Sequence, residues 1–335
     1  MSDGVEAGTY TRPVDLDVVF LGTAGSTPTA RRAPAATLIR RGGERILLDC
    51  GEGTQRQLLR SQVGLVDVDM VLFSHYHADH VLGFPGLLKT YDLRGREQGL
   101  EVYGPAGLDD LLTIFAPLVG RLGFPLRVRE LGDGDEVPGD GYRLLAHAVD
   151  HRGPAVAWEL REDERPGQFD VDEARRLGVP EGPAFGELQR GGSVAAADGS
   201  LITPDAVVGP ARRGRTLVFS GDTRPCTSVR RAALGADLLV HEASFVSDDG
   251  ARARQTRHST AAEAAELAAA SAVELLALTH LGARAAPRAF KDEARAIFAA
   301  TVVPRDFDTI ELPLPERGAP ELRRGGAHPD EETPR

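Results

Sequence analysis

Segment 74–80 of this chain, SHYHADH, holds four potential metal ligands within six residues: His75, His77, Asp79 and His80. Imidazole nitrogens and carboxylate oxygens are ligands that Zn²⁺ accepts readily in proteins. Two sets of such ligands on one turn can bind two ions a few ångströms apart, an arrangement that activates water for hydrolysis. The segment lies where an apolar run ends and a helical pattern begins. The sequence therefore predicts a metal centre at the end of a strand.

Three further candidate ligands, His151, Asp222 and His280, each follow a run of strand-like composition. Ligands in open α/β sheets lie at the carboxyl ends of strands, so these three side chains would complete two metal sites. The spacing leaves one alternative open. His147 precedes His151 by four residues on the same expected strand, and side-chain alternation places both on one face.

Apolar runs of strand length surround these ligands in two series, each bounded by turn residues. The expected strands are 16–21, 36–39, 45–49 and 69–74 in the first series, and 216–222, 237–242 and 273–280 in the second. The expected helices are 53–61, 81–92 and 107–118, then 226–234, 260–271 and 286–300. The pattern predicts an α/β fold built from two halves.

The halves are separated by residues 162–214, which are rich in Gly and Pro and show one convincing helical pattern, 171–177. A stretch of this kind within a compact domain is usually an excursion with a function of its own. Residues 1–14 and 316–335 are polar or rich in charge, Pro and Gly, and we expect both ends to be mobile. Residues 15–315 would then form the catalytic domain.

Composition excludes several classes of protein. The 335 residues carry 39 basic and 50 acidic side chains, a formal charge of −11, which argues against indiscriminate binding of polyanions. No segment approaches the roughly 20 apolar residues of a membrane span, and the first residues do not resemble a signal peptide. The only cysteines, Cys50 and Cys226, fit a reducing compartment, so we expect a cytoplasmic protein without membrane partners.

The H-x-H-x-D-H turn resembles the metallo-β-lactamase superfamily, and other segments narrow the resemblance to the ribonuclease Z family of tRNA 3′-processing endoribonucleases. Those segments are FLGT (20–23), LDCGEGTQ (48–55), VYGP (102–105), SGDTR (220–224), HEASF (241–245) and HST (258–260). Three positions depart from the family pattern: Ser244 replaces a Thr, and Gly282 and Ala285 replace a Ser and an aromatic residue. The last two lie where the substrate pocket would be lined.

The resemblance implies an αββα sandwich with an inserted flexible arm at about 162–210, and two zinc ions per subunit. One ion would be bound by His75, His77 and His151, which favours His151 over His147. The other would be bound by Asp79, His80 and His280, and Asp222 would bridge the two ions.

Acid–base roles are expected for three residues. Asp79 lies within the ligand cluster and can accept a proton from water, a role that the family also assigns to it. His258 is the candidate proton donor, because it precedes a capping-box pattern at Thr260 and Glu263 that would begin a helix, and a helix N-terminus favours phosphate. Glu242 follows a strand and could orient His258.

RNA contacts are expected from arginines that flank His258 and His280: Arg252, Arg254, Arg257, Arg284 and Arg288. In the family, a flexible arm grips the tRNA elbow, and Gly182 and Pro183 resemble its glycine-proline segment. The resemblance also implies a homodimer in which the arm of one subunit presents RNA to the site of the other.

These features predict a zinc-dependent endoribonuclease that cleaves tRNA precursors 3′ of the discriminator nucleotide. The products would be a tRNA 3′-hydroxyl and a trailer 5′-phosphate. A hydrolase of small phosphodiesters or sulfates with the same fold is the enzymatic alternative, although a small substrate needs no arm. A catalytically idle RNA-binding or metal-binding protein is the other alternative, which the complete ligand set disfavours.

Overall fold

The computed structural model describes residues 15–325, which divide into two compact units. The larger unit comprises 15–139, 143–161 and 215–325, and the smaller unit comprises 140–142 and 162–214. Both the N-terminal segment 1–14 and the last part of the expected C-terminal tail, 326–335, lie outside the described residues.

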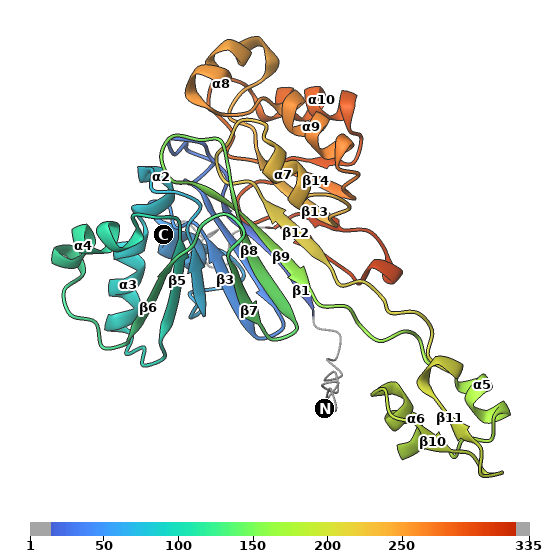
Figure 1. Cartoon of the computed structure of the whole chain (residues 1–335). Coiled ribbons are helices and arrows are strands. Elements are labelled where there is room, and N and C mark those ends of the chain that lie inside the picture. Colours follow the sequence, from blue (N-terminus) through green and yellow to red (C-terminus); the bar gives the residue numbers. More distant parts are fainter. Residues whose placement is uncertain (1–14, 326–335) are drawn as a thin grey trace, which may run out of the picture. The chain divides into compact units, whose positions relative to one another are not determined.

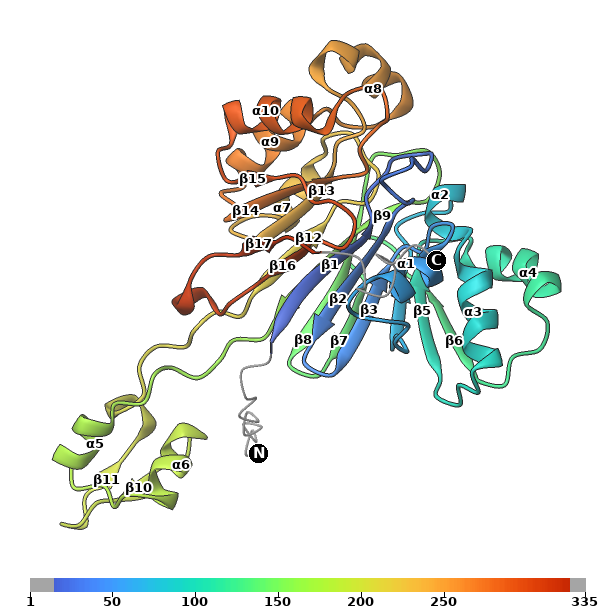
Figure 2. The same cartoon turned by 180° about the vertical axis from the view of Figure 1, so that it is seen from behind.

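Within residues 15–325, the larger unit contains an eight-stranded mixed sheet in the order β17-β16-β1-β2-β3-β4-β5-β6 (Figure 1, Figure 2). Its strands are β1 (Leu16–Gly22), β2 (Ala36–Arg41), β3 (Glu44–Leu48), β4 (Met70–Leu72), β5 (Leu100–Gly104), β6 (Leu126–Glu130), β16 (Thr309–Glu311) and β17 (Glu321–Arg323). Pairing is antiparallel from β17 to β3 and parallel from β3 to β6. The carboxyl ends of β3, β4 and β5 therefore meet at one edge.

The second sheet of the larger unit has seven described strands in the order β15-β14-β13-β12-β9-β8-β7. They are β7 (Glu136–Gly139), β8 (Tyr142–Ala148), β9 (Val156–Glu162), β12 (Thr216–Phe219), β13 (Leu238–Glu242), β14 (Leu275–Thr279) and β15 (Thr301–Val302). β12 to β15 are parallel, so the residues after β12, β13 and β14 share one edge.

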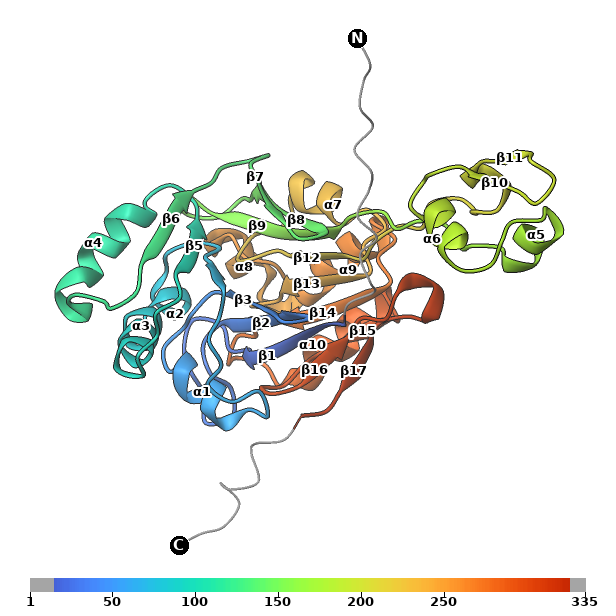
Figure 3. The ribbon, with the colours of Figure 1, turned by 90° about the horizontal axis from the view of Figure 1, so that it is seen from below.

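Helices cover the outer face of each sheet. They are α1 (Thr54–Arg60), α2 (Ala78–Val81), α3 (Phe84–Leu93), α4 (Leu108–Val119), α7 (Thr227–Ala232), α8 (Gly250–Thr256), α9 (Ala261–Ala270) and α10 (Pro287–Ile297), with 3₁₀ helices at Ser247–Asp249 and Pro315–Arg317. Leu58, Phe84 and Phe115 pack helices on the first sheet, while Val229 and Phe290 pack helices on the second. Figure 3 shows α1 and α7 on opposite outer sides.

The two sheets face each other through buried side chains. Trp158 of β9 is buried, and its Nε1 donates a hydrogen bond to the carbonyl of Phe73, which follows β4, at 3.1 Å. This bond fixes the edge of one sheet against the other. The resulting order of helices, sheet, sheet and helices confirms the predicted αββα sandwich.

The smaller unit has a core of its own. It contains α5 (Val171–Arg176), α6 (Pro183–Gln189), β10 (Val194–Ala195), β11 (Leu201–Ile202) and a 3₁₀ helix at Pro204–Ala206. Ala174, Leu188 and Ile202 are buried in its centre, and the rings of Phe169 and Phe185 lie 5.0 Å apart. These contacts explain α6, which the sequence did not predict. Pro183 and Gly186 weaken its helical pattern, and packing of Leu188 compensates.

Two expected boundaries differ from the structure. The helix expected over 81–92 is interrupted, because α2 ends at Val81 and α3 begins at Phe84. A Cβ at Gly83 would lie 2.0 Å from the carbonyl oxygen of Gly51, so the chain turns where only glycine fits. The tail expected from residue 316 contains β17, which pairs antiparallel with β16.

Among the described residues, no helix has the length and apolar character that a membrane span requires.

Candidate metal and catalytic site

The SHYHADH segment connects β4 to α2 at the edge where the parallel strands end. His75 and His80 are buried, and their ring centroids lie 4.1 Å apart. The short helix α2 turns His80 back toward His75, whereas His77 lies at its N-terminal boundary. Local structure therefore directs the imidazoles of this segment into one cluster.

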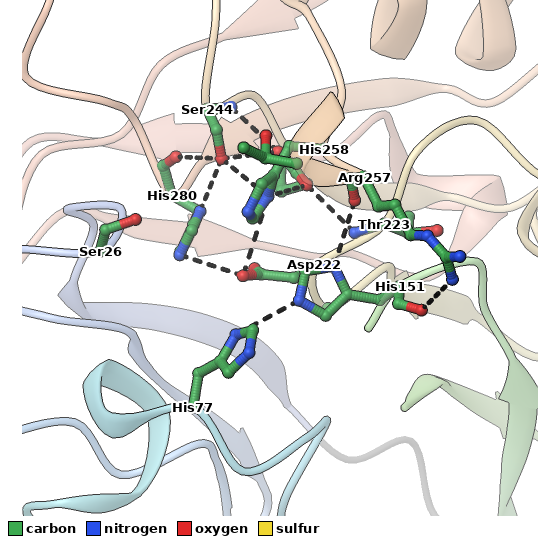
Figure 4. A network of polar contacts seen from close by, with 12 residues as sticks. Ser26, His77, His151, Asp222, Thr223, Ser244, Arg257, His258 and His280 are labelled. Carbon is green, nitrogen blue, oxygen red and sulfur yellow. Dashed lines mark hydrogen bonds and ion pairs between the residues drawn. The ribbon is translucent and has the colours of Figure 1, made fainter. Parts of the chain in front are cut away.

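His77 lies at the centre of the first group of ligand atoms, which also includes His75, His151 and Asp222 (Figure 4). Its Nδ1 lies 3.0 Å from His75 Nε2 and 3.3 Å from His151 Nε2. Two nitrogens bound to one zinc ion at about 2.0–2.1 Å in tetrahedral geometry are roughly 3.3 Å apart. The observed separations fit a shared ion.

The second group comprises Asp79, His80 and His280. His280 Nε2 lies 3.2 Å from Asp79 Oδ2 and 3.3 Å from His80 Nε2. Asp222 joins the two groups, because its Oδ2 lies 3.5 Å from His80 Nε2, 3.4 Å from His280 Nε2 and 3.6 Å from His75 Nε2. One buried carboxylate oxygen thus faces ligands of both groups.

The outer nitrogens of four of these imidazoles are held by neighbours. His75 Nδ1 lies 3.0 Å from Ser74 Oγ, and His280 Nδ1 lies 2.9 Å from Ser244 Oγ. His80 Nδ1 lies 2.7 Å from an Asp49 carboxylate oxygen, and His151 Nδ1 lies 3.1 Å from the Arg257 carbonyl oxygen. Each Nε2 is consequently directed into the cluster, as metal-binding histidines require.

Electrostatics favour a positive charge inside the cluster. Burial lowers the pKa of His75 well below its usual value, which keeps that imidazole neutral and able to bind a metal. Burial opposes a positive charge on His80, but the surrounding carboxylates of Asp222 and Asp49 outweigh it and raise the pKa of His80. Burial also opposes a negative charge on Asp222, but the surrounding imidazoles outweigh it and hold the pKa of Asp222 well below its usual range. A proton or a metal ion can supply the charge that these carboxylates attract.

His258 and Glu242 form a buried pair beside the ligands. His258 Nδ1 lies 2.7 Å from Glu242 Oε1, and the His258 ring stacks on His280 at 5.6 Å. Burial lowers the pKa of His258, but the Glu242 carboxylate outweighs it and raises the pKa to about 9. Glu242 is held in turn by the backbone N–H groups of Thr223 and Ser244, at 3.0 and 2.9 Å. The Glu242 carboxylate therefore favours the protonated form of His258.

Helix α9 begins immediately after this pair. The Thr260 side chain accepts a hydrogen bond from the Glu263 N–H, and the Glu263 carboxylate accepts one from the Thr260 N–H. This reciprocal pair confirms the predicted capping box. It also fixes the position of His258, which lies two residues before Thr260.

The structure separates the two histidines that the spacing could not distinguish. β8 ends at Ala148, so the alternation of side chains along the strand does not extend to His151, which reaches the cluster from the following loop. His147 Nε2 instead lies 2.8 Å from the buried carboxylate of Glu159. Among the described residues, His147 is not a member of any of the three groups of candidate ligands, the third of which joins Asp222, His258 and His280.

The other expected contact residues are divided between the two units. Arg252, Arg254, Arg284 and Arg288 are exposed. Arg257 contacts the ligand loop directly, because its guanidinium donates to the His151 carbonyl at 2.9 Å. At Gly282, an added Cβ would lie 2.3 Å from the Ser244 carbonyl oxygen, so this backbone accommodates no side chain there. Gly182 and Pro183 lie in the smaller unit, at the start of α6.

Sequence reasoning missed two groups that position the ligands, Asp49 and the Arg257 backbone. Asp49 accepts hydrogen bonds from the Ser74 N–H at 2.8 Å and contacts His80. Both residues have left-handed backbones, with φ of 55° for Asp49 and 62° for Arg257, as does His280 at 54°. Non-glycine residues rarely adopt this conformation, and its concentration here is typical of functional sites.

The chain is similar in sequence to known proteins over most of its length. Residues 30–280 match the metallo-β-lactamase superfamily. The ribonuclease Z of Myxococcus xanthus is 46% identical over 303 residues, which cover 89% of this chain and 98% of that protein. The ribonuclease Z of Methanosarcina acetivorans is 42% identical over 301 residues, with the same coverage of 89% and 98%.

Solved structures show the same architecture. The short form of human tRNase Z is 25% identical and superposes with a TM-score of 0.65, covering 89% of this chain and 99% of the human one. The metallo-β-lactamase fold protein YhfI of Bacillus subtilis also reaches a TM-score of 0.65, at 20% identity, and supports the fold alone.

Separate substitution of His151 and His147 tests which of the two histidines binds metal. We expect His151→Gln to lower the bound metal from about two ions to about one or fewer, because a ligand of the first group is removed. His147→Gln is the matched control and should retain the wild-type metal content. Mass spectrometry of metals in the purified variants measures both. Equal metal loss in the two variants, or none in His151→Gln, would contradict the assignment.

The origin of the His258 charge can be tested separately. In metal-free Glu242→Gln, burial and the Asp222 carboxylate remain while the Glu242 carboxylate is lost, so the pKa of His258 should fall clearly below about 9. NMR titration of ¹³C-labelled histidines measures this shift. A pKa that stays near 9 in the variant would show that another group stabilises the imidazolium.

Proposed function

Because the chain belongs to the ribonuclease Z family of the metallo-β-lactamase superfamily, we propose that it is a zinc-dependent endoribonuclease that cleaves tRNA precursors 3′ of the discriminator nucleotide. Cleavage leaves a 3′-hydroxyl on the tRNA and a 5′-phosphate on the trailer. The observation that carries this proposal is the complete two-group ligand cluster beside the His258–Glu242 pair, in a chain that matches ribonuclease Z proteins over nearly their whole length.

The metal that fits the cluster best is zinc. His75, His77 and His151 would hold one ion, Asp79, His80 and His280 the other, and Asp222 would contact both. Such a set of imidazoles with few carboxylates suits Zn²⁺ better than Mg²⁺, which prefers oxygen ligands. Bound there, two zinc ions would supply Lewis acidity and activate a water molecule near neutral pH.

Asp79 is positioned to accept a proton. Its Oδ2 accepts a hydrogen bond from the Ser26 N–H at 2.9 Å and lies 3.2 Å from His280 Nε2. Burial raises the pKa of Asp79, but His280 and His80 outweigh this effect and hold the pKa well below its usual range. The carboxylate is therefore ionised, as a proton acceptor must be, and its place within the cluster is what supports its role as the acceptor of the water proton.

His258 supplies a proton to the leaving group. As the water oxygen bonds to phosphorus, the bond to the ribose 3′-oxygen breaks, and this oxygen is a poor leaving group without a proton. The protonated form of His258 is favoured because Glu242 stabilises its charge. Glu242 does not reach the substrate in this scheme and acts by orienting and charging His258.

We assign substrate binding away from the cluster to the smaller unit, as the inserted tRNA-binding arm. Two segments of backbone connect it to the larger unit, and they pair in an isolated β-bridge between Arg165 and Arg212. The N–H of each residue donates a hydrogen bond to the carbonyl of the other at 2.8 Å. Gly182 and Pro183 begin α6 on this unit. Its own hydrophobic core supports its assignment as a separate module.

We also propose a homodimer. The outer face of α4 exposes Ile114 by 68% and Leu118 by 73%, and Leu93 at the end of α3 is 77% exposed. Adjacent exposed apolar side chains of this size commonly mark protein interfaces. A second copy of the chain would cover them.

The direct test of the proposed function is to incubate the zinc-loaded protein with a tRNA precursor and map both product ends. We expect a single cut after the discriminator nucleotide, with a 3′-hydroxyl and a 5′-phosphate. Hydrolysis of bis-nitrophenyl phosphate without cleavage of the precursor would favour a small-molecule hydrolase instead.

Removal of the smaller unit should separate binding from chemistry. The chain ends at Arg165 and Arg212 are already paired, so a short Gly-Ser linker can replace residues 166–211. We expect this variant to hydrolyse bis-nitrophenyl phosphate at the wild-type rate but to process tRNA poorly, because remote binding energy is lost. Equal losses on both substrates would show that the segment supports the catalytic unit.

His258→Ala should slow tRNA cleavage by about 10²–10⁴-fold, the usual contribution of a general acid. Zinc content and tRNA affinity should remain near wild type, since His258 is outside the proposed ligand set. The defect should shrink on bis-nitrophenyl phosphate, whose leaving group needs little protonation. Loss of zinc would instead make His258 a ligand, and equal defects on both substrates would assign the proton to another group.

A further inference from the structure

A basic groove lies beside the candidate site on the larger unit. Its first part, about 650 Å³, lies between the loop that carries Arg31 and Arg32 and the segment from Leu281 to Pro287. Its second part, about 420 Å³, lies against α10. Arg32, Pro287 and Arg305 line both parts, so the two hollows adjoin each other.

The lining of the groove includes Leu281, the residue that follows the candidate ligand His280. The N–H of Leu281 donates to the Thr23 carbonyl at 3.1 Å, while its own carbonyl accepts from the Gly25 N–H at 3.0 Å. The next residue, Ser26, donates to Asp79. The same loop that contacts Asp79 therefore continues into the wall of the groove.

The charge of the groove is opposite to that of the whole chain, which is −11. Its cationic lining residues are Arg31, Arg32, Arg288, Lys291, Arg305 and Arg324. The lining contains one carboxylate, Asp292, which is paired with Arg288 at 3.1 Å. Two of these cations are already paired, Arg288 with Asp292 and Arg324 with Asp308, so the groove keeps a local excess of positive charge on Arg31, Arg32, Lys291 and Arg305.

Three of these cations are available to a ligand. In the described part of the chain, no hydrogen bond or ion pair engages the side chains of Arg31, Lys291 or Arg305. Arg32 is half-buried and fixes the wall, because its guanidinium donates to the Pro304 carbonyl at 2.8 Å and to Thr23 Oγ1 at 2.6 Å. Arg32 is thus held in place by its hydrogen bonds, while Arg31, Lys291 and Arg305 are free to contact an extended anion in the groove.

The smaller unit lacks such free charge on its helices. Arg175 is paired with Glu181 at 2.8 Å, Arg190 with Glu187 at 3.0 Å, and Arg176 with Glu173. A carboxylate beside an arginine cancels its charge and repels an approaching phosphate, so a paired arginine attracts phosphate less than an unpaired one. Phosphate contacts that depend on cations are thus favoured in the groove of the larger unit.

We propose that this groove binds the backbone phosphates of the single-stranded RNA that passes the cleavage site, through Arg31, Arg305 and Lys291. The inference rests on the proposed endoribonuclease function and adds to it a second RNA site. The groove volumes suit a few nucleotides, since pockets of roughly 300–1,000 Å³ hold one compact ligand. Single strands bind in positively charged grooves of this kind, whereas a duplex needs a wider surface.

The test uses the zinc-loaded, full-length double variant Arg305→Gln, Lys291→Gln. Arg121→Gln, Arg129→Gln is the matched control, because both arginines are exposed on the same unit outside the groove lining. Binding of a fluorescent single-stranded RNA is measured at several salt concentrations. Each lost phosphate contact should reduce the salt slope by about 0.7, so the groove variant should lose about 1.4 while the control retains the wild-type slope.

Cleavage of precursors with trailers of one and about ten nucleotides then identifies the strand. A defect of the groove variant that grows with trailer length shows that the trailer occupies the groove. An equal defect at both lengths shows that the unpaired 3′ end of the tRNA occupies it. Hydrolysis of bis-nitrophenyl phosphate should remain unchanged, which shows that the catalytic cluster is intact.

A groove variant with wild-type RNA affinity, salt slope and cleavage would overturn the proposal. So would an equal loss in the control, because general charge and not the groove would then bind RNA. Since oligonucleotide binding is measured without cleavage, failure of wild-type protein to process tRNA would refute the proposed function without deciding the groove.

Discussion

The structure depends on one buried carboxylate. Asp222 follows β12 at the edge of the second sheet, and a single oxygen of its side chain lies 3.4 to 3.6 Å from three imidazole nitrogens. Burial of an ionised carboxylate is costly unless positive charge compensates it. His75 and His80, two candidate ligands that follow β4 of the first sheet, supply part of the surroundings of this carboxylate. The two sheets must therefore pack in a fixed position relative to each other. The hydrogen bond from Trp158 to Phe73 helps to fix that position behind the site.

The seven expected runs correspond to β1 to β4 and β12 to β14, because the buried strands are apolar. Strands with exposed side chains, such as β6 and β7, lack this apolar pattern and were not predicted. The sequence could not choose between His147 and His151, since alternation applies only inside a strand and β8 ends before His151. Asp49 and the Arg257 carbonyl were missed because their roles depend on left-handed backbones and on contacts across long sequence separations. Local propensity also failed for α6, whose stability comes from packing.

Charge is distributed unevenly over the chain. The helical arginines of the smaller unit are paired with neighbouring carboxylates, whereas the groove beside the candidate site retains free cations. An acidic protein can thus bind RNA if its few uncompensated cations are concentrated where the phosphates pass. In our proposal, the groove binds the RNA strand through its free cations, while the smaller unit supplies separate contacts to the tRNA.

We propose that two metal ions lie on either side of Asp222, held by the two groups of candidate ligands. Crystallography of the zinc-loaded protein, with anomalous data recorded on both sides of the zinc absorption edge, tests it most directly. The account predicts two anomalous peaks, one among His75, His77 and His151 and the other among Asp79, His80 and His280, with the Asp222 carboxylate between them. A single peak, or a peak coordinated by His258 in place of these ligands, would contradict it.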